Sequence, residues 1–505
     1  MSLSTRFGRS SGNRLLPRLA AIAALLCAAT PASAEPLNAA LASAYTNNPT
    51  LNAARATLRA TDEGVPQALS NYRPTVSLTG QAAYNKSISG TPQTTQPCTT
   101  VATAAAATQP GCTYQVRNGL FVGTRALANG PINTTASETL PRSVSLSIVQ
   151  PIFSGFRTVN GVKAAETAVL AGRETLRTSE QDTLLAAVTA YMNLVRDQAI
   201  VGLNRQNVAF LNEQVRAAQN RLNVGEGTRT DVAQAQATLA NAESTLQAAL
   251  ATVSNDEATY NQVIGHPPKN LVAAAPLEKM IPATAEAAVT LGLTRHPSVL
   301  AAQYNIDTAE YNVKLLEGNL LPNANLTGTL THADANNNPR NFSDTATITG
   351  RVTVPLYDAG ATQAQIRAAK ERLGQSRIQL DAARDNVRAL AVSGYGSLAS
   401  ARASVAAAEA GVRASQLALE GVQEEQRVGQ RTTLDVLNAQ QTLVTARTTL
   451  VRVQRDRVVA TYTLLSATGG LSAQTLGLAV KIYDPTEHYD AVHDKWFGIT
   501  TPDGR

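Results

Sequence analysis

The 505-residue sequence is poor in charged and aromatic side chains. Charged residues make up 16% of the chain and aromatic residues 4%, and the formal net charge is +6. Four of the positive charges, Arg6, Arg9, Arg14 and Arg18, lie in the first 34 residues, and without them the charge is about +2. This is not the strongly basic surface that binds nucleic acid, so we expect no nucleic-acid partner.

Motifs that carry catalytic chemistry are also absent. The five histidines form no His-Glu-x-x-His pattern, and the chain has no glycine-rich phosphate loop and no Gly-x-Ser-x-Gly motif. We therefore expect no enzyme activity, no cofactor and no bound metal. Energy and specificity would then have to come from partner proteins.

Beyond the first 34 residues, no stretch is apolar enough for a membrane-spanning helix. Residues 1–34 are typical of a secretory signal peptide, with an arginine-rich start, an apolar core at 19–29 and small residues at 32–34. Cys27 matches a lipid-attachment site poorly. The protein is expected to be exported, without a helical means of staying in a membrane.

The exported chain keeps two cysteines, Cys98 and Cys112. In an oxidising compartment, a lone pair this close in sequence favours a disulfide, and two free thiols are the alternative. Closing so short a loop would contribute roughly 3 kcal/mol in the chain-entropy account of disulfide stability.

One stretch occurs twice, and the rest of the chain is organised around it. Gly225 pairs with Gly429 and Asp231 pairs with Asp435, each 204 positions apart. A helical pattern ends at each glycine, which adopts the left-handed conformation that terminates helices. Another begins near each aspartate, within a Thr- and Asp-containing start signal. Each copy therefore predicts the tight turn of a helical hairpin.

The repeat extends over most of the chain. The offset of 204 also relates 151–155 to 355–359, and an offset of 248 relates 48–51 to 296–299. The chain is therefore predicted to consist of two tandem halves. The change of offset places 44 additional residues between Pro74 and Pro151. We interpret this excess, which holds both cysteines, as a loop running to about residue 140.

Hydrophobic periodicity places the elements of each half. The first repeat, 35–268, is predicted to contain helix 37–70, strands at about 75–85 and 142–150, long helix 158–224 and return helix 230–264. The second repeat, 285–469, is predicted to contain helix 285–320, strands at about 324–332 and 345–354, long helix 361–428 and return helix 434–468. We expect the linker 269–284 and the tail 470–505 to form an equatorial belt.

The four strands alternate small polar side chains with apolar ones. A half-buried soluble sheet gives the same alternation, but the signal peptide favours a membrane barrel with a wet interior. Four strands cannot close a barrel, and lipid does not tolerate open sheet edges. We therefore expect three chains to supply a shared barrel of twelve strands.

The long helices have coiled-coil spacing, with Ile366, Leu373, Leu380 and Val387 seven residues apart. Each would span roughly 100 Å at the rise of an α-helix. The predicted fold class is an α+β membrane protein. It combines a long antiparallel α-helical coiled-coil barrel with the shared twelve-stranded transmembrane β-barrel of a trimer.

The paired turns, the strand-to-helix joints 150–155 and 354–358, and the tandem halves together resemble TolC-type outer-membrane efflux proteins. The resemblance covers essentially the whole exported chain. It implies a homotrimeric conduit in outer-membrane lipid that extends across the periplasm. It also implies docking to an inner-membrane ABC or RND pump through a periplasmic adaptor (membrane fusion) protein.

The same resemblance implies a gate at the periplasmic end, closed by polar links between hairpins. By position, Arg431 is the cation of such a link, and Thr230 and Asp231 are its acceptors. Asp435 would be the acid that lines the constriction, and Asn438 stands where relatives can have a second acid. The alternative is that Thr230 and Asp231 only cap a helix and that the charge of Arg431 is solvated.

We therefore expect a passive export duct rather than an enzyme. The tail 483–498 resembles members of the family that serve type I protein secretion, which favours that role, and small-molecule efflux is the alternative. A structural periplasmic coiled-coil protein with a small soluble sheet, or a secreted enzyme, would be the other classes. The sequence names neither the substrate nor the pump.

Overall fold

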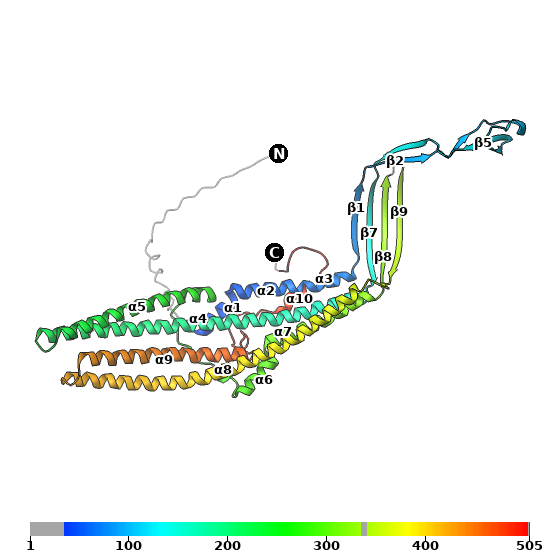
Figure 1. Ribbon diagram of the computed structural model, residues 1–505. Coiled ribbons are helices and arrows are strands. Elements are labelled where there is room, and N and C mark those ends of the chain that lie inside the picture. The colour runs from blue at the N-terminus through cyan, green and yellow to red at the C-terminus, as the bar shows by residue number, and fades with distance from the viewer. Residues whose placement is uncertain (1–34, 335–340, 503, 505) are drawn as a thin grey trace, which may run out of the picture. The chain divides into compact units, whose positions relative to one another are not determined.

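The computed structural model describes residues 35–334, 341–502 and 504, so the predicted signal peptide lies outside the described residues. The chain forms two compact units, each built from three segments (Figure 1). Among the described residues, the helical unit comprises 35–59, Ala171–Gln303 and Gln379–Pro485. The strand unit comprises Ala60–Leu170, Tyr304–Ile378 and Thr486–Arg505.

The strand unit contains one antiparallel four-stranded sheet in the order β1-β7-β8-β9 (Figure 1). Its strands are β1 (Thr75–Ala82), β7 (Arg142–Phe153), β8 (Asn323–Asp334) and β9 (Phe342–Thr353). The two repeats therefore contribute two strands each, as the alternating patterns predicted.

The register of this sheet sorts its two faces by polarity. Leu78, Leu146, Leu330 and Ala346 lie in one row across the four strands. The next row is Thr79, Ser145, Thr331 and Thr345. Because side chains alternate between faces along a strand, the face with Leu78 is mainly apolar, with the bonded pair His332 and Asp344 two residues along, and the other face is lined by hydroxyl groups. Within that second row, the hydroxyls of Ser145 and Thr331 are 3.0 Å apart and hydrogen-bonded.

The 44-residue excess is not the loop that the sequence analysis predicted. It contains β2 (Asn85–Pro92) paired with β6 (Ile132–Thr139), and a second small sheet of β3 (Thr95–Pro97), β5 (Leu120–Ala126) and β4 (Cys112–Arg117) (Figure 1). The prediction was wrong because it weighed the Gly and Pro residues as loop signals. The frequent threonines are β-branched and favour antiparallel pairing with neighbours close in sequence.

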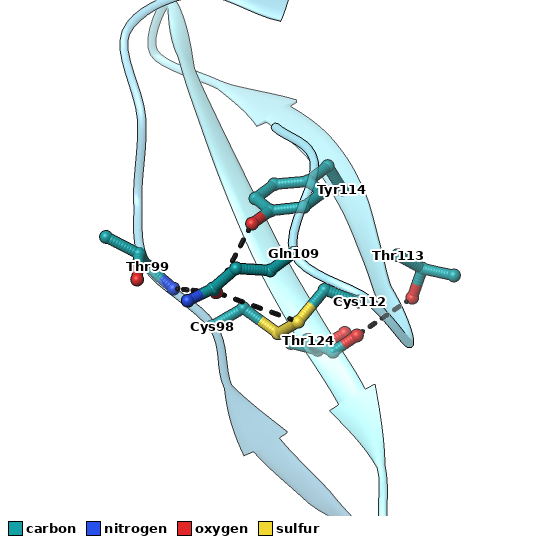
Figure 2. Close-up of a disulfide and its surroundings, with 7 residues drawn as sticks. All are labelled: Cys98, Thr99, Gln109, Cys112, Thr113, Tyr114 and Thr124. Carbon is teal, nitrogen blue, oxygen red and sulfur yellow. Dashed lines mark hydrogen bonds between the residues drawn. A yellow bond between two sulfur atoms is a disulfide. The ribbon is translucent and has the colours of Figure 1, made fainter. Parts of the chain in front are cut away.

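A disulfide joins Cys98, just after β3, to Cys112 at the start of β4, with a Cα–Cα distance of 6.3 Å (Figure 2). The Gln109 side-chain oxygen accepts a hydrogen bond from the Thr99 backbone N–H at 3.0 Å beside it. The Thr113 hydroxyl donates to the Thr124 carbonyl across the strand pair. The disulfide therefore ties the ends of the segment between β3 and β4 to the small sheet.

Two long helical hairpins dominate the chain (Figure 1). The first consists of α4 (Arg157–Asn223) and α5 (Arg229–Ile264), and the second of α8 (Ala361–Arg427) and α9 (Thr433–Ala467). At 67 residues each, α4 and α8 span roughly 100 Å. None of the helices that the structure describes is long and apolar enough to cross a membrane.

The two shorter helical segments are interrupted where the sequence predicted continuity, segment 37–70 twice and segment 285–320 once. Segment 37–70 forms α1 (Leu37–Asn47), α2 (Pro49–Asp62) and α3 (Gly64–Leu69), and 285–320 forms α6 (Ala285–Arg295) and α7 (Pro297–Glu317). A 3₁₀ turn ends each segment, at Ser70–Tyr72 and Gly318–Leu320.

Proline causes the break that the two segments share. Asn48 and His296 each precede a proline, and the proline ring disfavours helical backbone at the residue before it. Each takes an extended conformation, and its side chain accepts a hydrogen bond from a backbone N–H two residues on, at Thr50 and Ser298. One residue therefore both ends one helix and caps the next.

The core of the helical unit lies where α1, α4, α5 and α9 meet the linker and part of the tail. Tyr191, Tyr260, Leu41 and Leu471 are fully buried there. The hydroxyl of Tyr191 donates a hydrogen bond to the carbonyl of Val272 at 2.7 Å and accepts one from the backbone N–H of Val272 at 3.0 Å. This contact fixes the linker on the helices.

The joints between strand and long helix have the same backbone conformation in both repeats. Gly155 and Phe156 follow β7 with φ of 62° and 60°, and Ala359 and Gly360 follow β9 with φ of 56° and 87°. A Cβ on Gly155 would collide with the backbone carbonyl of Gly318. At the equivalent position of the second joint, Ala359 already has a Cβ. The first joint is therefore closely packed and the second is more open.

We predict that Gly155→Ala lowers the free energy of unfolding by at least about 2 kcal/mol, because left-handed strain adds to the clash with Gly318. Thermal unfolding of the purified full chain, followed by helical circular dichroism, measures this effect. Ala359→Gly is the matched control at the equivalent position, with an expected change within about 1 kcal/mol. Equal stability of the two variants would contradict the packing argument.

Candidate functional site

The two hairpin turns are built by the same hydrogen bonds. In the first, Gly225 takes a φ of 83°, and the N–H of Glu226 donates to the Arg221 carbonyl at 2.8 Å. In the second, Gly429 takes a φ of 81°, and Gln430 donates in the same way to Glu425. This is the Schellman arrangement that satisfies the last carbonyls of a helix. Glycine is required at both positions because the left-handed backbone disfavours a Cβ.

Each return helix begins with a capping box. The Thr228 hydroxyl accepts the Asp231 N–H, and the Asp231 carboxylate accepts the Thr228 N–H at 3.0 Å. Thr432 and Asp435 make the equivalent pair at the start of α9. Hydrogen bonds from the capping threonines hold the pKa values of both aspartates below their usual range. Both carboxylates are therefore ionised at neutral pH.

Arg431 lies against its own turn. Its Nε donates to Glu425 Oε2 at 2.7 Å, and this hydrogen bond raises the pKa of Arg431. About half of each side chain remains exposed, with relative exposures of 50% and 46%. A pair this exposed contributes about 0–1 kcal/mol and exchanges partners easily.

The structure brings the predicted gate residues to the two turns but does not pair them with one another. Thr230 is an exposed residue in the first turn of α5, and the helix N-cap is Thr228 instead. Asn438 is exposed on α9. Within this single chain, Arg431 contacts neither Thr230 nor Asp231. The capping role that the sequence analysis kept as an alternative applies to Asp231, as a partner in the capping box.

Close to the turns, the two hairpins pack against each other through a buried contact. The amide of Gln440 on α9 donates to Asn207 Oδ1 on α4 at 2.9 Å, and both side chains are less than 9% exposed. Leu437 packs beside Leu211 in the same region. Because a buried amide needs a partner, this bond defines how the two hairpins meet.

Further along the helices, a second group of polar residues joins the same hairpins. We call this group the Asp256 cluster. Its members come from α4, α5 and α9: Asn193, Arg196, Asp197, Asp256 and Arg455. The guanidinium of Arg196 donates two hydrogen bonds, of 2.6 and 2.7 Å, to the carboxylate of Asp197, and its Nη2 lies 3.8 Å from Asp256 Oδ2. Arg455 donates to Asn193 at 2.9 Å. The cluster therefore combines two neighbouring carboxylates with cations from two hairpins.

The two carboxylates of this cluster titrate differently. Burial and the hydrogen-bonded neighbour Asp197 raise the pKa of Asp256 to about 6. Burial also disfavours the charge of Asp197, but its hydrogen bonds to Arg196 keep its pKa below the usual value. Asp197 therefore stays ionised, whereas the charge of Asp256 depends on pH.

The sequence analysis missed both inter-hairpin contacts, although the repeat carried a signal for them. At the offset of 204, Asn207 aligns with Gly411, Asp256 with Ala460, and Arg455 with Ala251. A polar residue in one half where the other half has Gly or Ala marks a position that breaks the internal symmetry. Residues of this kind lie outside the motifs that the two halves share, so those motifs alone do not reveal them.

Comparison with known proteins fits this architecture. The outer membrane efflux protein family matches residues 40–266 and 289–470. The chain is 45% identical to the outer membrane efflux protein BepC of Brucella suis biovar 1 (strain 1330), over 94% of each chain. It is 28% identical to the alkaline protease secretion protein AprF of Pseudomonas aeruginosa, over 66% of this chain and 71% of that protein.

Solved structures agree in fold. The crystal structure of CusC superposes with a TM-score of 0.69 at 16% identity, covering 86% of this chain and 92% of that one. The chain therefore belongs to the outer membrane efflux protein family, whose members include TolC. Its fold is the α+β channel-tunnel fold of that family, and its location is the outer membrane.

The Asp256 cluster predicts a pH-dependent stability. Because the pKa of Asp256 is raised in the folded state, the protonated carboxyl contributes stability that is lost as pH rises from about 4 to about 6. Asp256→Asn removes this loss, so the variant should be more stable than wild type by about 1–2 kcal/mol above pH 6, with little difference near pH 4. Thermal unfolding across this pH range measures it.

The neighbouring exposed Glu257→Gln is the control, with an expected change within about 0.5 kcal/mol at every pH. A stability difference between Asp256→Asn and wild type that stays constant from pH 4 to pH 8 would contradict the assignment.

Proposed function

We propose that three copies of this chain form a closed conduit across the outer membrane, continued by the helical hairpins through the periplasm. The observation that carries the proposal is the four-stranded sheet, whose outer strands β1 and β9 are each paired on one side only. In lipid, unpaired backbone groups cost several kcal/mol each. Three such sheets joined edge to edge give twelve strands without a free edge, within the range of known barrels.

The face pattern of the sheet supports the same assembly. The row containing Leu78 and Leu330 suits lipid, and the row containing Thr79 and Thr331 suits a water-filled interior. Val76 and Leu78 are 64% and 71% exposed in the single chain, as expected for side chains whose solvent is lipid. The helical hairpins would then enclose the periplasmic part of the duct.

We propose that the two turns form the periplasmic gate of this conduit. In the closed assembly, Arg431 would leave Glu425 and bond to Thr230 and Asp231 of a first turn. The weak, exposed Arg431–Glu425 pair and the ionised state of Asp231 support this exchange. Each charge-assisted link contributes about 1.5–3 kcal/mol, and less when exposed. A docking partner can therefore shift the equilibrium towards the open state.

In the same assembly, Asp435 would line the constriction as a single ring of acids, since Asn438 supplies none. We infer weaker cation selectivity than a duct with two acid rings would have. A periplasmic adaptor protein and an inner-membrane pump of the ABC or RND class would supply docking and energy.

The substrate class has two candidates. BepC, the relative that matches at 45% identity over nearly the whole chain, is named an efflux protein, which supports efflux of small molecules. AprF, at 28% identity, is named for alkaline protease secretion, and the tail 483–498 resembles that group. The greater identity and coverage of BepC lead us to place efflux first and type I protein secretion second.

Single-channel conductance in planar bilayers tests the duct and its gate. We expect a small wild-type conductance that rises several-fold in Arg431→Ser, because the link to the first turn is lost. Glu425→Gln is the matched control and should leave the conductance low, because Glu425 is not part of the closed link. Equal opening by both variants would place the gate in the Arg431–Glu425 pair, and no current from any correctly folded variant would contradict the duct.

Deletion of the gene tests the substrate class. We expect greater sensitivity to several unrelated toxic compounds, with the set of secreted proteins unchanged. Complementation by wild type should restore resistance, whereas a chain with both turns locked together by engineered cysteines should not. Loss of one secreted protein without drug sensitivity would favour type I secretion instead.

A further inference from the structure

The end of the tail exposes a compact group of large apolar side chains, which we call the aromatic loop (residues 495–500). Relative exposures are 59% for Trp496, 85% for Phe497 and 101% for Ile499. The rings of Trp496 and Phe497 lie side by side, with centroids 6.2 Å apart. Contiguous apolar surface of this kind marks a site of interaction.

The loop has a defined shape. The ammonium of Lys495 donates to the carbonyl of Thr500, which closes the base of the loop. Gly498 takes a φ of 104°, a left-handed conformation that lets the chain reverse between Phe497 and Ile499. The apolar side chains are therefore held outside a closed backbone loop.

Two contacts hold the aromatic loop at the start of the sheet. The guanidinium of Arg73 lies 4.7 Å from the centre of the Trp496 ring, and its Nη1 donates to the Lys495 carbonyl at 3.2 Å. Strand β1 begins at Thr75, so at most about 7 Å of extended chain separates Arg73 from the first strand residue.

The helix before the loop is anchored in the same unit. On α10 (Pro485–Val492), the Nδ1 of the buried His488 lies 3.1 Å from a carboxylate oxygen of the buried Asp62 of α2. This contact adds to those of Arg73, so the start of the aromatic loop and the helix before it are both attached to the strand unit.

The chemistry of the loop matches the boundary between lipid headgroups and acyl chains. Tryptophan is enriched at this depth because its ring is apolar and its N–H is polar. Arg73 and Lys495 at the base are cations that suit phosphate headgroups. Tyr72, one residue before Arg73, is 48% exposed and adds a second aromatic side chain of the interfacial type.

We propose that the aromatic loop is an interfacial anchor, inserted into the membrane surface at the end of the sheet where β1 begins. The proposal rests on the proposed membrane-spanning role of this sheet, and it is independent of the gate. The loop contacts Arg73, which lies just before β1, and this position favours lipid, rather than a soluble partner or a second copy of the chain, as the surface that the loop binds.

The test uses intrinsic fluorescence, because Trp496 is the single tryptophan of the sequence. The full-length protein is reconstituted into phosphatidylcholine vesicles brominated at successive acyl positions. We expect blue-shifted emission, quenched at least twofold by bromines near the headgroup and progressively less by deeper ones. Trp496→Phe supplies the tyrosine background.

The Phe497→Ser, Ile499→Ser double variant keeps the fluorophore and removes the neighbouring apolar anchors. We expect its quenching to fall by half or more, while its channel conductance stays that of wild type. Vesicle flotation and conductance show independently that the sheet has inserted. If the protein has inserted but the emission of Trp496 is not quenched, the anchor proposal is wrong. If that unquenched emission is also blue-shifted, the loop is covered by protein rather than by lipid.

Discussion

Every backbone N–H and C=O group within lipid needs a partner, and this requirement governs the rest of the molecule. One chain supplies four strands in the order β1-β7-β8-β9, so each sheet has two unpaired edges, which the proposed trimer would pair. The alternation of Leu78 and Thr79 along β1 fits the same assembly, in which one face would meet lipid and the other water. The tandem halves contribute two strands each, and each half then continues into a long helix.

The duplicated halves share their turns but differ in the contacts that join them. Both turns use a left-handed glycine followed by a Thr–Asp capping box, so both hairpins end in the same backbone geometry. In the bonds between the hairpins, Asn207, which pairs with Gln440, and Asp256 and Arg455 of the Asp256 cluster stand at positions where the halves have diverged. Divergence therefore gave the chain a specific pairing of two similar hairpins, while the turns themselves kept the same geometry in both halves.

Sequence patterns predicted the elements well where a signal was local or periodic. The long helices, the four strands of the main sheet and the two glycine turns all follow from heptads, alternation or helix-end residues. The excess segment was wrongly predicted as a loop, because its Gly and Pro residues outweighed its β-branched threonines. The breaks at Asn48 and His296 were missed, although a proline follows each of them. Arg431 was assigned to an acceptor in the other turn, but within one chain it lies against Glu425.

The sequence by itself determined the tandem organisation, the hairpin turns, the polarity of the strands and the absence of catalytic motifs. These properties depend on residues a few positions apart or on a repeat that can be aligned. Only the tertiary structure decided which residues of one hairpin meet those of the other, and that the tail brings Trp496 to Arg73 at the start of β1. Contacts between residues hundreds of positions apart depend on which faces pack together, and no local pattern encodes that choice.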